Sequence, residues 1–138
     1  MSRGKLSKVR RSENMRCIKS KDTKPEILVR QAVHSMGYRF RLHVRHLPGK
    51  PDLVFPRLRK IVEVRGCFWH QHSRCIDSHI PKSRVGYWRP KLLNNRARDN
   101  ANLRRLRALG YAVLVLWECE ILERTDNTLS RLRQFLES

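Results

Sequence analysis

The chain is 138 residues long, the size of one domain, and its 31 Lys and Arg against 12 Asp and Glu give a formal net charge of +19. Because self-repulsion at this charge disfavours a compact fold, we expect a polyanionic partner, and nucleic acid fits best since cations that neutralise phosphates release condensed counterions. No apolar run reaches the roughly 18 residues of a membrane span, and residues 1–8 lack the apolar core of a signal peptide, so we expect a cytoplasmic protein.

The N-terminal part is predicted to contain a basic arm and two helices. Residues 1–11 carry Lys or Arg at five positions, which indicates an arm that is mobile until it meets DNA or, alternatively, a solvated tail. Residues 12–20 are read as a short helix. A longer helix begins after Thr23, which can cap it, with Glu26 completing a capping box, and ends before Gly37.

Four strands are predicted along the rest of the chain. They cover residues 38–43, 52–55, 60–64 and 111–117. The first alternates aromatic or apolar residues with basic ones, and the next two are rich in β-branched residues. The fourth is apolar throughout, so we expect it to be buried.

The segments between and after these strands complete the predicted fold. Residues 67–86 lack periodicity and are predicted to form a loop, which must be held in place by something other than regular apolar packing. A helix over residues 91–109, with Pro90 in its first turn or kinking it, precedes the last strand, and residues 127–136 form a final helix. The order predicts a single α/β domain over residues 1–138, with a mixed central sheet flanked by helices.

Cysteine and histidine are concentrated in the predicted loop. In a reducing compartment, four cysteines point to metal binding or free thiols rather than disulfides. Three candidate ligands within nine residues, and a fourth after the last strand, would make a closed tetrahedral zinc site that clips the loop to the sheet. The four candidates are Cys67, His72, Cys75 and Cys119. His70 and His79 compete for the histidine position, and Cys17 is read as a buried or incidental thiol.

Two carboxylates are placed to converge on one divalent cation. Asp52 begins one predicted strand, Glu63 lies in the next, and Arg65 shares a strand face with Glu63. Phosphodiester hydrolysis needs a hard cation on the scissile phosphate and a held water. The pattern resembles the PD-(D/E)-x-K nuclease superfamily, with Arg65 in the position of its Lys. Alternatively, Asp52 is a turn residue and Glu63 a surface charge.

Large aromatic residues stand in this polar, cationic part of the chain. Phe68 and Trp69 are adjacent, and Trp88 follows Tyr87. Such side chains are costly to leave in water, so they either anchor the core or wedge between base pairs, as in DNA-bending proteins. His70 lies between the predicted zinc and magnesium ligands and could act as a general base near neutral pH.

Together these segments resemble the very-short-patch-repair (Vsr) mismatch endonuclease family, from about residue 12 to residue 119. The matching segments are Ser-Glu-Asn-Met-Arg at 12–16, Leu-Pro-Gly-Lys-Pro-Asp at 47–52, Gly-Cys-Phe-Trp-His at 66–70, Tyr-Trp at 87–88, Asn-Arg-Ala-Arg-Asp at 95–99 and Trp-Glu-Cys at 117–119. The Cys-Phe-Trp-His segment with Pro-Asp at this distance is the most specific part. The resemblance implies a restriction-endonuclease-like fold with a zinc-stapled loop.

The resemblance also implies the residues of the catalytic site. Asp52 matches the family's catalytic, magnesium-binding aspartate, and Val64 stands where a backbone carbonyl is the second metal ligand. His70 matches the histidine thought to activate water. Glu26 and Asp99 match acidic residues that hold metal-bound waters.

Structural and DNA-binding residues follow from the same match. The family's structural zinc ligands correspond to Cys67, His72, Cys75 and Cys119. The aromatics that intercalate beside the mismatch correspond to Phe68, Trp69 and Trp88. Met15 belongs to the segment that clasps the DNA, and Lys91 and Asn95 match residues that approach the mispaired bases.

The implied activity is a magnesium-dependent nick of one strand, next to a thymine mispaired with guanine, that starts repair of deaminated 5-methylcytosine. The implied cofactors are catalytic Mg²⁺ and structural Zn²⁺. The implied partner is double-stranded DNA with a mismatch, mismatch-repair proteins are candidate protein partners, and the family suggests a monomer that acts at the bacterial nucleoid.

Some positions depart from the family pattern, and other functions remain open at this point. Glu63 and Arg65 stand where a family member has apolar and His residues, so Glu63 is either a metal ligand or an outward charge near DNA. The spacing over residues 72–75 is one residue longer. One alternative is a related nuclease with another target, such as restriction or phage defence. The other is a non-catalytic, zinc-stapled DNA-binding module; on charge alone, a ribosomal or chromatin-type protein also fits.

Overall fold

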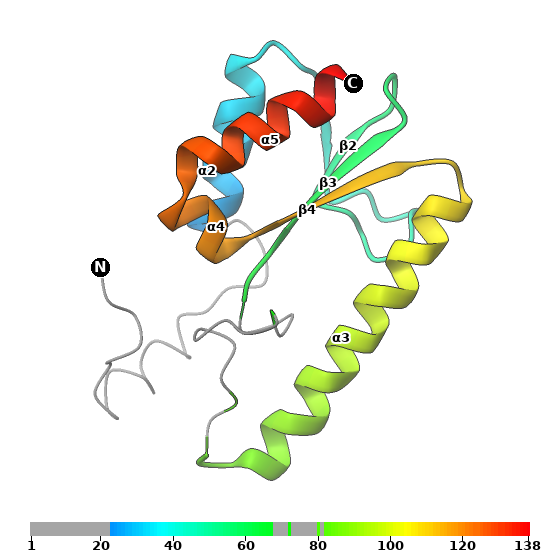
Figure 1. The fold of residues 1–138 in the computed structure, drawn as a ribbon. Coiled ribbons are helices and arrows are strands. Elements are labelled where there is room, and N and C mark those ends of the chain that lie inside the picture. The colour runs from blue at the N-terminus through cyan, green and yellow to red at the C-terminus, as the bar shows by residue number, and fades with distance from the viewer. Residues whose placement is uncertain (1–22, 68–71, 73–79, 81) are drawn as a thin grey trace.

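The computed structural model describes residues 23–67, 72, 80 and 82–138. In this part of the chain a four-stranded sheet lies between helices (Figure 1). The helices are α2 (Lys24–Ser35), α3 (Val85–Ala108), α4 (Glu118–Glu123) and α5 (Thr125–Glu137). The strands are β1 (Arg41–Leu42), β2 (Leu53–Phe55), β3 (Lys60–Arg65) and β4 (Ala112–Trp117). The predicted arm over residues 1–11 and the helix over 12–20 lie outside the described residues.

The sheet is mixed, as the sequence predicted. Its strand order is β1-β2-β3-β4. β1, β2 and β3 are antiparallel neighbours, and β4 runs parallel to β3, with Val62 opposite Leu114. A parallel pair requires a crossover connection, and the long helix α3 lies in that connection.

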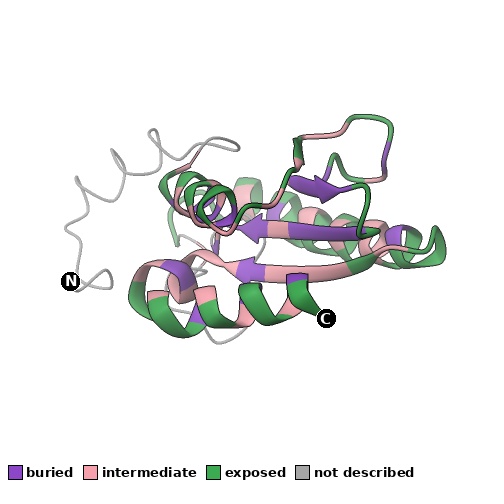
Figure 2. Cartoon of the chain, turned by 90° about the horizontal axis from the view of Figure 1, so that it is seen from above, coloured by how far each residue is buried: buried purple, intermediate pink, exposed green. Residues whose placement is uncertain are grey.

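Helices cover both faces of the sheet. One buried cluster joins α2, α4 and α5 to the sheet through residues such as Val33, Val62 and Leu132. A second cluster packs Leu106 of α3 against Ile61. Because successive side chains of a strand point to opposite faces, Ile61 and Val62 serve the two different clusters. Figure 2 shows the buried strand residues enclosed between the helices. The α/β layer architecture of the prediction is confirmed.

The last helix is tied to the start of β3 by a buried lysine. Lys60 is only 9% exposed, and its ammonium donates hydrogen bonds to the carbonyl oxygens of Phe135 (2.6 Å), Leu136 (3.4 Å) and Ser138 (2.7 Å). Carbonyl groups in the last turn of a helix lack the N–H partners of the helix interior, so a cation there helps to satisfy them. The contact fixes the C-terminal end of α5 against the sheet.

Several predicted elements differ from those in the structure. The strand expected over residues 38–43 is reduced to two exposed residues, because the chain turns at His43 with a left-handed backbone (φ 46°). The helix expected from residue 91 begins at Val85, so Pro90 lies in the second turn and not in the first. The predicted buried strand β4 is an edge of the described sheet, and of its six residues only Leu116 is buried. Helix α4 was not predicted.

Candidate active site and thiol–imidazole cluster

Asp52 lies immediately before β2. Its carboxylate takes the place of a backbone carbonyl as hydrogen-bond acceptor for β3. Pairing between β2 and β3 ends at Leu53 and Val62, so the backbone N–H of Val64 points towards Asp52 beyond the last pair. That N–H donates to Oδ2 of Asp52 at 2.7 Å. A buried backbone donor must be satisfied, and this bond fixes one oxygen of the carboxylate.

Helix α2 brings a second carboxylate to this place. Glu26 is 3% exposed and its Oε2 accepts from the guanidinium of Arg30, one helical turn on, at 2.9 Å. Thr23 caps the helix as predicted, by accepting from the Glu26 N–H. The carboxylate itself faces the sheet, where it lies beside His43.

His43 stands between the two carboxylates. Its Nε2 lies 3.7 Å from Oε2 of Glu26, and its Nδ1 lies 3.6 Å from Oδ1 of Asp52. Potential ligand atoms of these three residues all lie within 4.8 Å of one another. The sequence analysis missed His43, because nothing in the pattern around it distinguishes a functional histidine from a strand residue.

A pocket opens over Asp52 and contains further predicted site residues. Glu63, Val64 and Asp99 line it together with Asp52. The basic residues around it are Arg45, Lys50 and Arg65. Carboxylates among basic side chains suit a divalent cation and a phosphodiester better than an apolar ligand.

Glu63 and Arg65 face the same side of β3, as predicted. The Arg65 guanidinium is 3.2 Å from Oε2 of Glu63, and it also lies over the ring of Trp117 at 5.9 Å. Arg65 is 7% exposed. Such a buried guanidinium is held in place by its partners, so it is a fixed positive charge at the edge of the pocket.

Burial perturbs the ionisation of Asp52. Loss of solvent around the carboxyl raises the pKa of Asp52 from 3.8 to about 8, against the hydrogen bond from Val64, which lowers it. The charges of Glu26 and Glu63 raise this pKa further, and Arg30 lowers it. Crowded carboxylates that resist ionisation favour a bound cation, because the cation offsets their repulsion.

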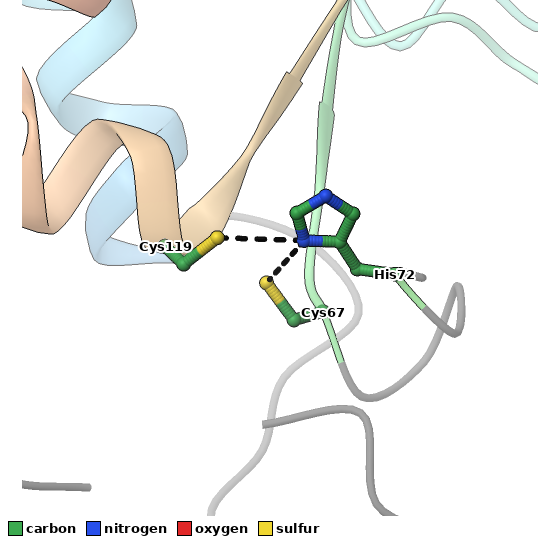
Figure 3. Close-up of side chains that lie close together, drawn as sticks. All are labelled: Cys67, His72 and Cys119. Atoms are coloured by element: carbon green, nitrogen blue, oxygen red, sulfur yellow. Dashed lines mark hydrogen bonds between the residues drawn. The ribbon is translucent and has the colours of Figure 1, made fainter. Parts of the chain in front are cut away.

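The second cluster contains two thiols and an imidazole (Figure 3). Nδ1 of His72 lies 3.7 Å from Sγ of Cys67 and 3.4 Å from Sγ of Cys119. Both cysteines come two residues after the last paired residues of the parallel strands β3 and β4, Arg65 and Trp117. The parallel register therefore brings together two thiols far apart in the sequence.

Neighbouring groups orient this cluster. The His72 ring stacks on Trp117, with ring centroids 4.1 Å apart and planes 10° from parallel. Burial lowers the pKa of His72, and Glu120 raises it in part. Neutral imidazole and soft thiolates are the donors that Zn²⁺ prefers. The structure thus gathers three of the four predicted zinc ligands.

Helix α3 carries the predicted base-contacting residues. Trp88 packs edge-on against Tyr87 at 4.9 Å between ring centroids, and the ammonium of Lys91 lies 5.5 and 5.8 Å from the centres of the two rings. Asn95 accepts from the guanidinium of Arg98. In Figure 1 the N-terminal end of α3 extends away from the sheet. The exposed end of α3 therefore projects aromatic and basic side chains outward, while Asp99 further along reaches the pocket.

The remaining predicted site residues lie outside the described residues. They are Met15, Phe68, Trp69, His70 and Cys75. His79, the competing ligand candidate, and Cys17 are also outside them. None of the described helices is long and apolar enough to cross a membrane.

Comparison with known proteins gives consistent matches. The family described as DNA mismatch endonuclease Vsr matches residues 4–76. The type II nicking enzyme V.XorIIP of Xanthomonas oryzae is 47% identical over 133 residues, which cover 96% of each chain. The type II nicking enzyme V.NmeAIP of Neisseria meningitidis is 43% identical, over 81% of this chain and 79% of that one. DNA mismatch endonuclease Vsr of Escherichia coli is 37% identical, over 94% and 83% respectively.

Proposed function

The chain belongs to the DNA mismatch endonuclease Vsr family, and on this premise we propose that it nicks one strand of duplex DNA beside a thymine mispaired with guanine. Such a nick would start very-short-patch repair of deaminated 5-methylcytosine. The family is one of DNA endonucleases, so the reading as a non-catalytic DNA-binding module no longer stands. The observation that carries the proposal is the pocket lined by Asp52, Glu63 and Asp99, with the buried carboxylate of Glu26 close to Asp52.

The donor set of this pocket fits Mg²⁺, which binds oxygen ligands. We assign Asp52 and the backbone carbonyl of Val64 as direct ligands. In an extended strand the N–H and C=O of one residue point to the same edge, and the N–H of Val64 already reaches Asp52. The carbonyl therefore faces the same edge. Bound magnesium would supply Lewis-acid stabilisation of the scissile phosphate.

The protein's own residues would prepare the attack of water on phosphorus. Glu26 and Asp99 are assigned to hold water molecules next to the cation, and His70 to accept the proton of the attacking water. Glu63 is a further acidic residue of the site, whose charge faces Arg65. The basic residues around the pocket would hold the flanking phosphates.

The thiol–imidazole cluster is assigned to structural Zn²⁺. Cys67, His72 and Cys119 supply three ligands, and Cys75 is proposed as the fourth. A closed site of this kind would clip the loop after β3 to the start of α4, and so fix the segment that contains His70 beside Asp52.

DNA contacts are assigned to the aromatic and polar side chains. Phe68, Trp69 and Trp88 would enter the stack beside the mismatch, where the step costs less to open than a paired one. Lys91 and Asn95 would approach the mispaired bases, and Met15 would belong to a segment that clasps the duplex. Residues 1–11 are proposed as a mobile basic arm. The rest of the proposal is a single, monomeric domain that acts at the nucleoid. Mismatch-repair proteins are candidate partners.

A second candidate is a nicking enzyme that serves a restriction system. The names of the relatives at 47% and 43% identity, both type II nicking enzymes, favour it. The same site would perform the same hydrolysis, and the difference would lie in the sequence around the target.

The test is a nicking assay with zinc-loaded protein and end-labelled duplexes. One duplex carries a T:G mismatch and its control a T:A pair in the same flanking sequence, each with and without added Mg²⁺. Magnesium-dependent nicking of the T:G duplex alone is expected. Equal cutting of both duplexes would overturn mismatch specificity. A panel of flanking sequences then separates general repair from a target tied to one restriction site.

A further inference from the structure

His43 occupies a central place in the proposed active site, yet the proposed function gives it no role. It links two elements of that site, because its backbone N–H donates to the carbonyl oxygen of Asp52 at 3.1 Å and its ring reaches Glu26 of helix α2. Its backbone is left-handed, with φ at 46°. This conformation is uncommon for a residue with a Cβ, and backbone strain of this kind is found more often at functional sites.

The neighbours of the ring determine which nitrogen bears the proton. Nη2 of Arg30 lies 3.1 Å from Nε2 of His43 and 2.9 Å from Oε2 of Glu26. A guanidinium only donates, so Nε2 must accept and Nδ1 bears the hydrogen. Nε2 of His43 and Oε2 of Glu26 lie 3.7 Å apart, but both are acceptors of the Arg30 guanidinium. They therefore do not form an ion pair.

This tautomer argues against His43 as a metal ligand, although it lies within reach of two carboxylates. Nε2 already accepts from Arg30, and Nδ1 presents a hydrogen towards Oδ1 of Asp52 across 3.6 Å. A nitrogen that bears a hydrogen has no lone pair for a cation. The opposite tautomer would set an N–H against the donors of Arg30, which cannot give up a proton.

We propose that His43 is a positioning residue, whose Nδ1–H keeps the Asp52 carboxylate in the orientation that takes up the divalent cation. The Val64 N–H donates to Oδ2 at 2.7 Å, and Nδ1 of His43 lies 3.6 Å from Oδ1, so an N–H group faces each oxygen of the carboxylate. Arg30 fixes the tautomer, and Glu26 fixes Arg30. This inference rests on the proposed function of Asp52 as a metal ligand.

The test measures Mn²⁺ binding to the full, zinc-loaded chain, with free Mn²⁺ counted by electron paramagnetic resonance. His43→Ala is expected to raise the Kd for Mn²⁺ about 10-fold, as loss of an outer partner of a ligand does. His43→Asn should restore much of the affinity, because its amide N–H stands near the position of Nδ1 and Asn tolerates a left-handed backbone. His43→Gln places its amide nearer the position of Nε2 and should not.

Three controls separate this role from a structural one. His43→Gly relieves the backbone strain and should bind Mn²⁺ as weakly as His43→Ala. His34→Ala removes an exposed histidine and should leave the Kd unchanged. The Mg²⁺ concentration for half-maximal nicking should rise in parallel with the Kd, whereas the rate at saturating Mg²⁺ should change much less. Asn and Gln retain side-chain bulk, so their comparison holds even if the Ala variant folds poorly.

The outcomes distinguish this inference from the function on which it rests. A wild-type Kd in His43→Ala or His43→Gly, or equal weakening in the Asn and Gln variants, would overturn the positioning role. Mn²⁺ affinity that follows this order, in a protein that nicks no duplex, would support His43 and overturn the nuclease proposal. Wild-type protein that binds no Mn²⁺ would overturn both.

Discussion

The two histidine-containing clusters differ in how they affect the folded state. Cys67, His72 and Cys119 are soft donors, and the cation proposed for them would contribute to folding because it joins two strand ends and a loop. Asp52 stands among carboxylates whose charges oppose its ionisation. Ionisation of Asp52 therefore costs stability until a cation is bound. The thiol–imidazole cluster is therefore expected to stabilise the fold, and the carboxylate site around Asp52 to carry out the reaction.

The largest expected effect is on the rate of nicking. Asp52→Asn should reduce the rate by a factor of about 1,000 or more, because it removes a ligand of the proposed catalytic metal. DNA binding should remain, since no phosphate contact is lost, and so should the zinc content. The measurement combines single-turnover nicking with a filter-binding isotherm. A variant that still cuts at wild-type rate would remove Asp52 from the metal site.

Loss of a thiol should instead destabilise the protein. Cys119→Ser should release zinc and lower Tm by about 5 °C or more, since even a few kcal/mol shifts the midpoint of a small domain this far. Cys17→Ser makes the same chemical change at the cysteine assigned no ligand role and is the matched control. Zinc content by atomic absorption and Tm by calorimetry are measured together. Unchanged values in Cys119→Ser would exclude this ligand.

The raised pKa of Asp52 predicts a pH dependence with a definite sign. Its folded pKa of about 8 exceeds the unfolded value of 3.8, so the folded state binds more protons between these values. The contribution of this carboxyl to the stability of magnesium-free protein is therefore present below pH 4 and is lost as pH rises towards 8. Mg²⁺ should stabilise the protein more at pH 8 than at pH 6, because it competes with that proton.

Melting curves of wild type and Asp52→Asn at several pH values isolate this contribution. Without added Mg²⁺, the difference in Tm between the two proteins should change from pH 5 to pH 8. The Tm of wild type should fall relative to that of Asp52→Asn as pH rises. A difference that stays constant from pH 5 to pH 8 would show that the carboxyl is not perturbed.

The smallest expected effect concerns recognition. Trp88→Ala should lower the preference for mismatched over paired duplex about 10-fold, since stacking of an aromatic on a base contributes roughly 1–3 kcal/mol. Stability should change less than recognition, because Trp88 lies in the first turn of α3, among exposed residues. Tyr87→Phe retains that ring contact and serves as the control. An unchanged preference accompanied by a lower Tm would assign Trp88 to packing.

The sequence predicted features that depend on local pattern or on rare residues. Thr23 identified the start of α2 because capping is a local interaction, and the density of Cys and His pointed to the thiol–imidazole cluster. The mixed sheet followed from the alternation of elements. Pro90 led to a wrong start for α3, because the helix begins at Val85 and accommodates the proline in its second turn.

Features set by tertiary contacts were not predictable in this way. The apolar run of β4 suggested a buried strand, yet its place at the edge of the described sheet leaves most of it half-buried. His43 gained its position from a left-handed turn and from Arg30 on another element. The local pattern around Glu26 indicated only a helix-capping residue; its place in the site was implied by the family resemblance, and the structure places its carboxylate close to Asp52.

The register of β3 and β4 has a consequence for how the chain folds. Cys67 and Cys119 each follow the last residue pair, Arg65 and Trp117, by two positions, so they would be opposite one another if the ladder continued. A slip of one residue would carry Cys119 about 3.3 Å along the sheet and turn its neighbours to the wrong face. Pairing of strands so distant in sequence is slow and prone to error. A cation that needs both thiols would bind tightly only after the correct alignment has formed. It would therefore stabilise the correct register over a shifted one.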